Sequence, residues 1–518
     1  MEKELPKNWI ILPLEKLGEN KYYSIGDGDH GQIKPSDYKE SGVPYIRVGD
    51  LDWGFFKEEK LVYISEEVHS KNLKSELLPG DILIAKTGAT IGKCCIVPNH
   101  IKKANTTSSV GKVSINKDLT SSKWILYYFL SPDFFKLMWS HSHRTAQPGF
   151  NIIDLKNFPI PLPPLAEQNR IVAKLDALFA QLETIKTSMA KVPLLLKDFR
   201  QQVLTQAVTG KLTEEWRKVR ELEDISVFEK KVYDYKYNAY ENELKKWKEK
   251  SSDKNYKNRL IKPSKPKVLP IVEDWENENN FEIPKEWKFV RFNDVTNKIG
   301  DIDHKMPKDY PNGIPYLSTG NMKDVNNLDF ENAKTISKED YEVLAAKIKP
   351  ENGDIIFPRY GTIGRNILID FDKEFLVSYS CAIIKNFNEL MIPKYIYFVS
   401  ISQFIKYEIS KHVVQTTQAN IGIASIEKFL FPLCTTQEQQ EIVSRVESLF
   451  AKAEAIEKQY ESLKAKIDTL PQAILHKAFK GELTEQLDSD GDARELLREI
   501  EGLKAMSGKV SKKQKVKV

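Results

Sequence analysis

A glycine-rich stretch, Gly88 to Cys94, is the first place in this sequence where residue types suggest chemistry. A phosphate-binding loop of the Walker type needs four residues between its glycines and a Ser or Thr after the lysine. Here Gly88 and Gly92 have three residues between them, and Cys94 follows Lys93. A similar stretch later in the chain ends in Arg365. We therefore predict a tight turn rather than a nucleotide site.

Histidines and carboxylates suggest metal binding or acid–base chemistry. His141 and His143 lie two residues apart, but no cysteine stands at the spacing of a zinc site, so we expect a surface or DNA-facing role for them rather than metal binding. The best acidic cluster is Asp301, Asp303 and His304, for which we find no convincing equivalent in the first half and expect a loop turn. Because nucleophile elbows and dinucleotide fingerprints are also missing, the sequence favours a binding protein over an enzyme with an unrecognised active site.

Composition is typical of a globular protein with more than one domain. The chain has 518 residues, of which 41% are hydrophobic and 29% charged. The absence of a long apolar run and of a signal-peptide core at Met1 to Trp9, together with only four cysteines, predicts a cytoplasmic protein in a reducing compartment. The net charge of +5 is compatible with a nucleic-acid partner without requiring one.

Several segments of the sequence occur twice, in the same order. The matched pairs are Pro6–Trp9 with Pro284–Trp287, Gly42–Tyr45 with Gly313–Tyr316, Gly80–Leu83 with Gly353–Ile356, Thr87–Lys93 with Tyr360–Arg365, and Gly210–Glu214 with Gly481–Glu485. A repeat of this length indicates two copies of one structural module. We expect each module to begin with a mixed α/β domain, with strands near 44–48, 82–85 and 94–97 and single helices at 123–139 and 393–410.

A long helix is predicted to end each module. Apolar residues alternate at spacings of four and three from Ile171 to Val203, and again from Ile442 to Ile474. This heptad pattern predicts that the two helices pack on each other; the alternative is that each lies only on its own domain. Pro193 and Pro471 predict a kink or a local break in each helix. Between the modules, residues 214–262 predict a solvated helix and a linker. Residues 502–518 predict a disordered basic tail, whose charge is either simply solvated or touches DNA phosphates.

The segment Phe158–Gln168, followed by Ile171-Val172 and the heptad helix, resembles the boundary between a target-recognition domain and a conserved helix in type I restriction-modification specificity subunits. Phe429–Gln439 is a weaker second copy. The segments Gly80–Leu83 and Gly210–Thr213, with their repeats, are also similar to the family. Although each motif alone is weak, their duplicated order is specific and covers nearly the whole chain.

The resemblance implies a mixed α/β fold with two target-recognition domains joined by two long antiparallel coiled-coil helices. Each domain would read one part of an asymmetric, bipartite DNA target. The helices would hold two methyltransferase subunits, and restriction/translocase subunits would join through the complex. By this resemblance the chain is not catalytic and carries no cofactor, while S-adenosylmethionine, ATP and Mg are expected in the partners. The rival from another class is a coiled-coil scaffold with protein-binding ends.

The expected boundaries follow from the repeats. They are 1–164 for the first recognition domain, 165–212 for the first helix, 213–283 for the spacer, 284–434 for the second recognition domain, 435–485 for the second helix and 486–518 for the C-terminal extension.

Candidate DNA-binding residues are polar or basic side chains expected on loops, because bases are read by hydrogen bonds in the grooves and phosphates by positive or amide donors. They are Arg47, Lys86, Thr87, Lys93, Arg144 and Gln147 in the first domain, and Arg359, Tyr360, Arg365, Lys411, Gln415 and Gln418 in the second. Lys86 and Arg359 are the sharpest of these predictions, because both precede the repeated glycine turn and differ between the halves.

Overall fold

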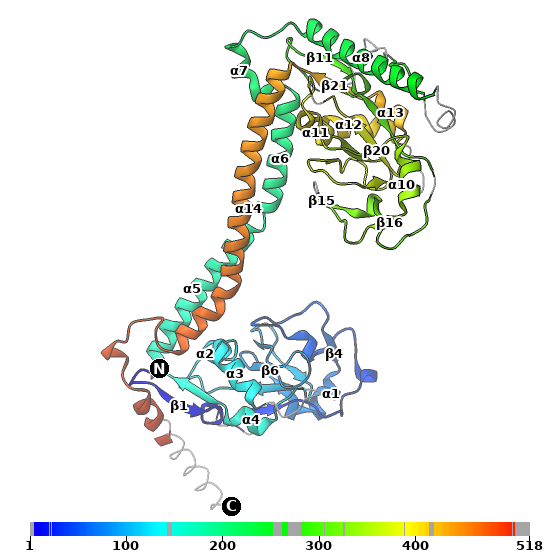
Figure 1. The fold of residues 1–518 in the computed structure, drawn as a ribbon. Helices are drawn as coiled ribbons and strands as arrows, with labels where there is room; N and C mark the ends of the chain where they lie inside the picture. The colour runs from blue at the N-terminus through cyan, green and yellow to red at the C-terminus, as the bar shows by residue number, and fades with distance from the viewer. Residues whose placement is uncertain are drawn as a thin grey trace, which may run out of the picture. The chain divides into compact units, whose positions relative to one another are not determined.

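The chain divides into two compact units in the computed structural model, Met1–Ala190 with Tyr460–Val518, and Lys191–Gln459. The structure describes residues 5–19, 21, 23–141, 148–251, 262–267, 281–304, 306–324, 327–387, 389–413, 419–499 and 501–502. Each unit consists of one globular domain and the adjoining parts of the long helices (Figure 1). The basic tail beyond residue 502 lies outside the described residues.

The first domain contains three sheets, in the strand orders β2-β9-β6-β7, β4-β3-β8-β5 and β1-β10. Neighbouring strands are antiparallel except for the parallel pair β3 and β8. The strands are β1 (Ile10–Pro13), β2 (Ile25–Asp27), β3 (Val43–Ile46), β4 (Val62–Ile64), β5 (Glu76–Leu77), β6 (Ile82–Ala85), β7 (Cys94–Ile96), β8 (Ala104–Thr106), β9 (Val110–Val113) and β10 (Pro159–Leu162). The strand predicted at 82–85 is confirmed, and those predicted at 44–48 and 94–97 are shorter.

The second domain repeats this topology. Its sheets have the orders β12-β20-β17-β18, β16-β13-β19, β14-β15 and β11-β21, and β13 with β19 is again the parallel pair. The strands are β11 (Lys288–Arg291), β12 (Lys298–Gly300), β13 (Ile314–Leu317), β14 (Met322–Asp324), β15 (Asn327–Leu328), β16 (Lys334–Ile336), β17 (Ile355–Pro358), β18 (Ile367–Leu368), β19 (Leu376–Val377), β20 (Cys381–Lys385) and β21 (Leu430–Leu433). The duplicated module inferred from the sequence is therefore confirmed as a duplicated fold.

Short helices cover the sheets, and two of the predicted helices were wrong in their extent. The helices are α1 (Glu66–Lys71), α2 (Ser122–Phe129), α3 (Pro132–Ser140) and α4 (Ile152–Asn157), then α10 (Lys338–Ala345), α11 (Pro393–Ile401), α12 (Gln403–His412) and α13 (Ile423–Glu427). The helices predicted at 123–139 and 393–410 are each two helices. Ser131 and Ser402 start the second helix of each pair, because their hydroxyls accept hydrogen bonds from the backbone N–H of Phe134 and Ile405.

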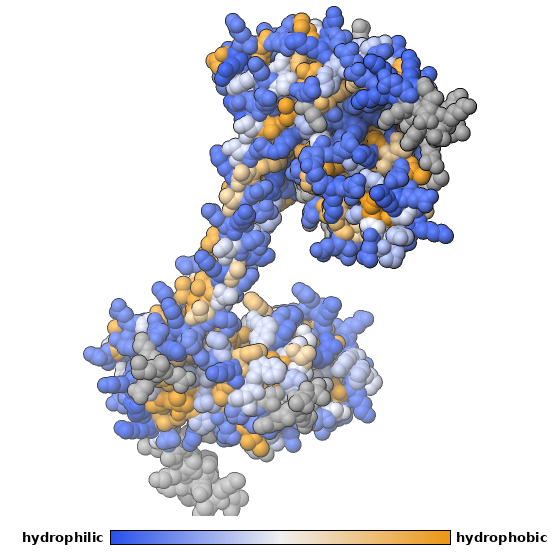
Figure 2. Space-filling view, in the orientation of Figure 1, coloured by the Kyte–Doolittle hydropathy of each residue, from blue (hydrophilic) through white to orange (hydrophobic). Residues whose placement is uncertain are grey.

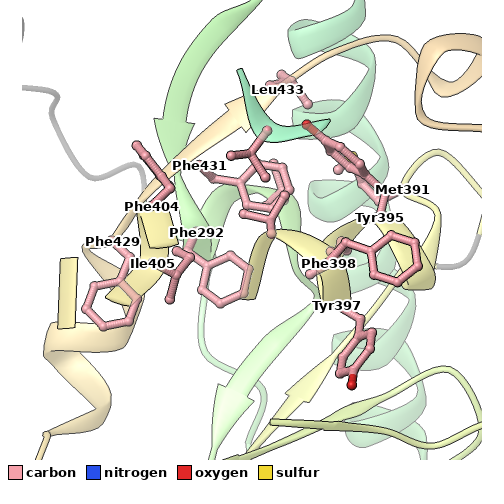
Figure 3. Packing of buried hydrophobic residues seen from close by; sticks show 14 of the residues in the cluster. Phe292, Met391, Tyr395, Tyr397, Phe398, Phe404, Ile405, Phe429, Phe431 and Leu433 are labelled. Carbon is pink, nitrogen blue, oxygen red and sulfur yellow. The ribbon is translucent and has the colours of Figure 1, made fainter. Parts of the chain in front are cut away.

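Aromatic side chains fill the core of the second domain (Figure 3). The rings of Phe292 and Phe431 stack 5.6 Å apart, and Tyr395 meets Phe431 edge to face. The Tyr395 hydroxyl donates to the carbonyl of Pro432. Trp124 takes the same place in the first domain, where its Nε1 donates to the carbonyl of Pro161. Each domain therefore joins its helix layer to its last strand through one buried aromatic donor.

The long helices are α5 (Leu165–Met189), α6 (Val192–Val208) and α14 (Thr436–Phe479), and they pair in antiparallel fashion. In the first unit, Ile171 near the start of α5 shares a core cluster with Phe479 at the end of α14. In the second unit, Val208 at the end of α6 shares a cluster with Ile442 near the start of α14, and α6 lies beside α14 in Figure 1. The predicted helix pairing is confirmed, and the alternative of separate helices is wrong.

The two prolines act differently. The first long helix breaks between Met189 and Val192, and Pro193 sits in the first turn of α6, where its missing N–H costs little. Pro471 lies inside α14, which continues to Phe479 without a break. The side chain of Phe479 is buried in the first domain, and this packing holds the helix beyond the proline. The break predicted at Pro193 is confirmed, whereas α14 has no break at Pro471.

The region between the modules forms two helices, α7 (Glu214–Lys218) and α8 (Ile225–Ser251). The prediction of a solvated helix was wrong for one face of α8. Phe228, Val232 and Lys236 are spaced four residues apart on this face, and all three are at least 95% buried. The Lys236 amino group donates to the carbonyl of Asn293. The face packs on the second domain, so α8 is a covering layer of that domain.

A buried glutamate fixes the start of each long pair of helices. Glu167, in the first turn of α5, accepts hydrogen bonds from Trp9 Nε1 at 3.1 Å and from Gln486 Nε2 at 2.7 Å. Because Trp9 and Gln486 come from opposite ends of the chain, Glu167 joins the first domain to the segment that follows α14.

Glu438, in the first turn of α14, has the same place in the second unit. It accepts from Trp287 Nε1 at 2.8 Å and from Thr213 Oγ1 at 2.7 Å, and it pairs with Arg217. The segment after each long helix thus binds the start of the opposite helix in both units.

Candidate nucleic-acid interface

Two of the candidate DNA-binding residues, Lys86 and Arg359, lie where strands of the large sheet of each domain end. Both β2 and β6 are antiparallel to β9, which lies between them. They therefore run in the same direction, and their carboxyl ends lie at one edge of the sheet. Asp27 ends β2 and Lys86 directly follows β6. Asp301 and Arg359 occupy the same positions after β12 and β17 in the second domain.

An ion pair crosses this edge in the first domain. The Lys86 amino nitrogen lies 2.6 Å from a carboxylate oxygen of Asp27, and only 6% of Lys86 is exposed. The lysine side chain passes Gly111 of β9, where an added Cβ would lie 3.3 Å from Lys86 Cγ and 2.9 Å from Leu155 Cδ2. Glycine at this position therefore leaves the space that the ion pair uses.

The second domain has a larger version of the same ion pair. Arg359 is 7% exposed and pairs through Nη1 with Asp301. Its Nε donates to the carbonyl of Ile421 at 2.9 Å, and its Nη1 also reaches the carbonyl of Tyr379 at 3.4 Å. The Arg359 side chain thus binds three other segments, whereas the Lys86 side chain binds one.

Lys86 and Arg359 therefore lie inside their domains in this structure. A direct base contact by either side chain requires its ion pair to open, and a buried cation separated from its carboxylate is costly. Their positions support a structural role: each ion pair holds the glycine turn against the loop that follows β2 or β12. Base reading by these two residues stays a prediction.

The turn that follows Lys86 has the tight geometry predicted from its glycines. Gly88 and Gly92 have φ values of +89° and +87°, which non-glycine residues rarely adopt. The amide of Gly92 donates to the carbonyl of Ala85 at 2.9 Å. Thr87 is exposed at the start of the turn, and Lys93 at its end lies 2.9 Å from Asp52.

Through its contact with Asp52, Lys93 at the end of the turn belongs to a cluster of charged side chains on the surface. Lys57 and Lys93 hold the pKa of Asp52 below its usual range through hydrogen bonds to its carboxylate. Two lysines share this one carboxylate, so the cluster keeps a net positive charge beside the turn. Such a surface favours an anionic partner.

The second domain presents different side chains at the equivalent places. Tyr360 takes the place of Thr87, and the Arg359 guanidinium lies 5.6 Å from the centre of its ring. Arg365, at the end of the turn, is exposed. Lys411 at the end of α12 lies 3.1 Å from Glu408 and 4.6 Å from the ring centre of Tyr407. The turn is repeated, but the groups that it exposes are not.

The remaining candidates divide into one described residue and four that are not described. Arg47 follows β3 and donates to the carboxylate of Asp50 and to the carbonyl of Lys60. Its counterpart after β13 is Ser318, whose backbone N–H donates to the Asn321 side chain in a turn of the same shape. The other candidates, Arg144, Gln147, Gln415 and Gln418, lie outside the described residues.

One repeated element was missed in the sequence. The prediction that the Asp301, Asp303 and His304 cluster has no equivalent in the first half was wrong, because Ile25-Gly26-Asp27-Gly28-Asp29-His30 matches Ile299-Gly300-Asp301-Ile302-Asp303-His304. The match is structural as well, since β2 beside β9 and β12 beside β20 are the edge strands of equivalent sheets. The signal was the repeated order Gly-Asp-x-Asp-His.

Comparison with known protein families decides what this duplicated fold is. The family model described as type I restriction modification DNA specificity domain matches twice, at residues 25–194 and 284–465. The two matches together cover more than half of the chain and coincide with the two repeats. The chain belongs to the type I restriction-modification DNA specificity family. This specificity subunit is the DNA-recognition component and not a catalytic one.

Two known specificity subunits match this chain along nearly their whole length. The EcoKI specificity subunit of Escherichia coli strain K12 is 27% identical, with 99% of each chain covered. The EcoBI specificity subunit of Escherichia coli is 26% identical, covering 98% of this chain and 95% of the relative. The match therefore includes both domains and both helical regions.

Solved structures show the same fold. The HsdS subunit from Thermoanaerobacter tengcongensis matches with a TM-score of 0.55 at 17% identity, covering 93% of this chain and 99% of that one. A chain from a structure of complex assembly and conformational transition in a type I R-M system matches with a TM-score of 0.56, also at 17% identity, with 93% and 100% covered.

Three further observations concern the described part of this specificity subunit. Among the described residues, no group of three or more His, Cys, Asp or Glu side chains is placed to hold a metal ion. None of the described helices is long and apolar enough to cross a membrane. The four cysteines are buried, and burial raises the pKa of Cys95 and of Cys381 to about 12, so these thiols are poor nucleophiles.

Proposed function

We propose that this specificity subunit recognises an asymmetric DNA target in two parts, one part by each globular domain. The observation that carries the proposal is the repeated sheet edge, which has one geometry in both domains but exposes different side chains. Thr87 and Tyr360, or Arg47 and Ser318, stand at equivalent positions. Two frameworks of one shape with different reading groups are suited to two different half-sites.

The paired helices are proposed to hold two methyltransferase subunits and, through the complex, the restriction and translocase subunits. In support, large apolar side chains are exposed along the helices, and Figure 2 shows hydrophobic residues among the hydrophilic ones there. They are Ile185, Leu463 and Leu470 in the first unit, and Leu194, Leu195, Phe199 and Ile456 in the second. Exposed apolar side chains on a narrow helix pair favour a protein partner.

The chemistry is assigned to these partners. The methyltransferase subunits would bring S-adenosylmethionine and methylate adenine, and the restriction subunits would use ATP and Mg. This chain would choose the site for both reactions. A coiled-coil scaffold with protein-binding ends has no observation that favours it over DNA recognition, since the family matches both repeats.

Duplex binding by the full chain tests the proposal. We expect binding that weakens steeply with salt, because phosphate contacts release counterions, and that strengthens when methyltransferase subunits are added. Binding that is insensitive to salt and to the added subunits would contradict the proposal and favour a scaffold. Turnover by the isolated chain would contradict the assignment of the chemistry to its partners.

A further inference from the structure

We propose that His30 and His304 are a matched pair of DNA phosphate contacts, one in each recognition domain. They would hold both half-sites without reading their bases. This inference rests on the proposed function, because it requires the chain to bind DNA. It assigns a role to the repeated Gly-Asp-x-Asp-His element that ends the first strand of each large sheet.

Both the first aspartate and the histidine of this element are the same in the two domains. Asp27 and Asp301 have a structural reason to be alike, since each forms the buried ion pair with Lys86 or Arg359. The histidines are not members of these buried pairs. Their side chains are 70% and 64% exposed, so core packing does not account for the identity of His30 and His304.

Each imidazole lies beside the carboxylate of the buried pair. His30 Nε2 is 3.1 Å from Asp27 Oδ1, and His304 Nε2 is 3.9 Å from Asp301 Oδ2. The His304 ring also stacks on Tyr379, with ring centres 4.4 Å apart, and the Tyr379 carbonyl accepts from Arg359. The exposed histidine is thus attached to the same framework that positions the glycine turn.

This arrangement is suited to an anionic partner. An imidazole that takes up a proton on meeting a phosphate has two N–H donors, so one can face the aspartate while the other donates to a phosphate oxygen. The aspartate beside each histidine is already paired with the buried cation, and in the second domain Lys347 also lies 3.4 Å from Asp301 and 3.3 Å from Asp303. A phosphate oxygen satisfies both the free donor and the charge of the protonated imidazole.

A phosphate contact also accounts for the repetition. Base contacts carry sequence information and must differ between two domains that read different half-sites, whereas phosphate contacts position the protein and carry none. The neighbours that differ between the domains, such as Thr87 and Tyr360, fit the first role. The histidines that do not differ fit the second.

The test compares His30→Ala, His304→Ala and the double variant with the parent chain, all assembled with the methyltransferase subunits. A matched control is His100→Ala, because His100 is 62% exposed and lies 3.1 Å from Glu58 but has no repeat. Fluorescence anisotropy measures binding to a duplex that contains the target sequence of the complex and to a scrambled duplex, from about 50 mM to about 200 mM salt.

We expect each single variant to bind both duplexes about three- to tenfold more weakly, the double variant to lose about the product, and the salt slope to become shallower by about 0.9 per histidine. His100→Ala should bind like the parent. Unchanged affinity of the double variant, when the parent binds, overturns the inference and leaves the proposed function intact. A loss confined to the target duplex also overturns it, because base reading would then be the cause.

Two further results separate the remaining explanations. If His30→Gln and His304→Gln, which keep a donor for the aspartate without the charge, restore full affinity, the histidines only position the loop and the inference is overturned. If the parent complex itself fails to bind DNA, the proposed function fails and the inference fails with it. Thermal melting of each variant within about 2 °C of the parent is expected, because exposed side chains contribute little to stability.

Discussion

The two recognition domains share their interior and differ at their surface. Both have the same strand order in the large sheet, the same glycine turn and an ion pair between Asp27 or Asp301 and the residue after β6 or β17. The ion pair is Lys86 with Asp27 in one domain and Arg359 with Asp301 in the other, and Arg359 makes more bonds. The repeated residues therefore build the edge of the large sheet, and the residues that vary on this edge are free to determine what is recognised.

The largest expected effect concerns the buried glutamates. Glu438→Ala should destabilise its unit by about 3 kcal/mol, because it removes the buried partner of Arg217 and leaves this arginine only the more exposed Glu286, 3.5 Å away. Glu167→Ala should cost about 1 to 3 kcal/mol, since it leaves neutral donors on Trp9 and Gln486. Chemical denaturation, with hydrogen exchange to locate the unfolding unit, measures both.

The matched controls for this pair are Glu438→Gln and Glu167→Gln, which keep the side-chain size and remove the charge. We expect Glu438→Gln to lower the free energy of unfolding more than Glu167→Gln does. Equal losses for the two alanine variants would show that the Arg217 ion pair adds nothing to the second unit, contrary to the comparison.

The next largest effect is expected at the two edge cations. Arg359→Ala should weaken binding to the target duplex about tenfold, because it removes a buried ion pair and a bond to the carbonyl of Ile421. Lys86→Ala should weaken it about threefold, since Lys86 holds only Asp27. Anisotropy titrations of both variants measure the difference. If Arg359→Ala binds every target as tightly as the parent, the role given to this edge is wrong.

A change in helix length should move one domain without altering its reading edge. Four residues inserted near Val208, at the end of α6, add about one helical turn of 5.4 Å. We expect the tolerated gap between half-sites to grow by about one to two base pairs, with the half-sites themselves unchanged. A methylation assay on a library of spacer lengths measures this, and an unchanged gap would refute it.

The smallest effect that we expect is a dependence of the stability of the second domain on pH. Burial lowers the pKa of Lys236 on α8 to about 8, below its value in the unfolded chain. Between these two values the unfolded chain binds more protons, so the free energy of unfolding should rise with pH, by about 1 kcal/mol from about pH 7.5 to about pH 9. Lys236→Met should lack this rise. Denaturation of both proteins across the range measures it, and parallel curves would contradict the assignment.

Much of the fold could be predicted because the sequence contains each element twice. The heptads from Ile171 and from Ile442 predicted the helix pairing, and the repeated glycines predicted the tight turn. Helix breaks were harder, because Ser131 and Ser402 act as N-caps within otherwise helical patterns. In the same way, the apolar face of α8 was hidden by its many charged residues.

The candidate site could be predicted only in part. The turn was found, but the burial of Lys86 was not, since its partner Asp27 lies 59 residues away and only the strand order brings them together. The role of Gly111 depends on the same packing. His30 and His304 were available to sequence reasoning, but they lie before the stronger glycine motifs that were used to align the halves.

Long-read mapping of adenine methylation, in cells with and without this gene, tests most directly whether two matched domains direct methylation to a two-part target. The account predicts one additional motif when the gene is present, made of two unlike specified parts separated by an unspecified gap of fixed length. Identical methylation in both strains, or a new motif without a gap, would contradict it.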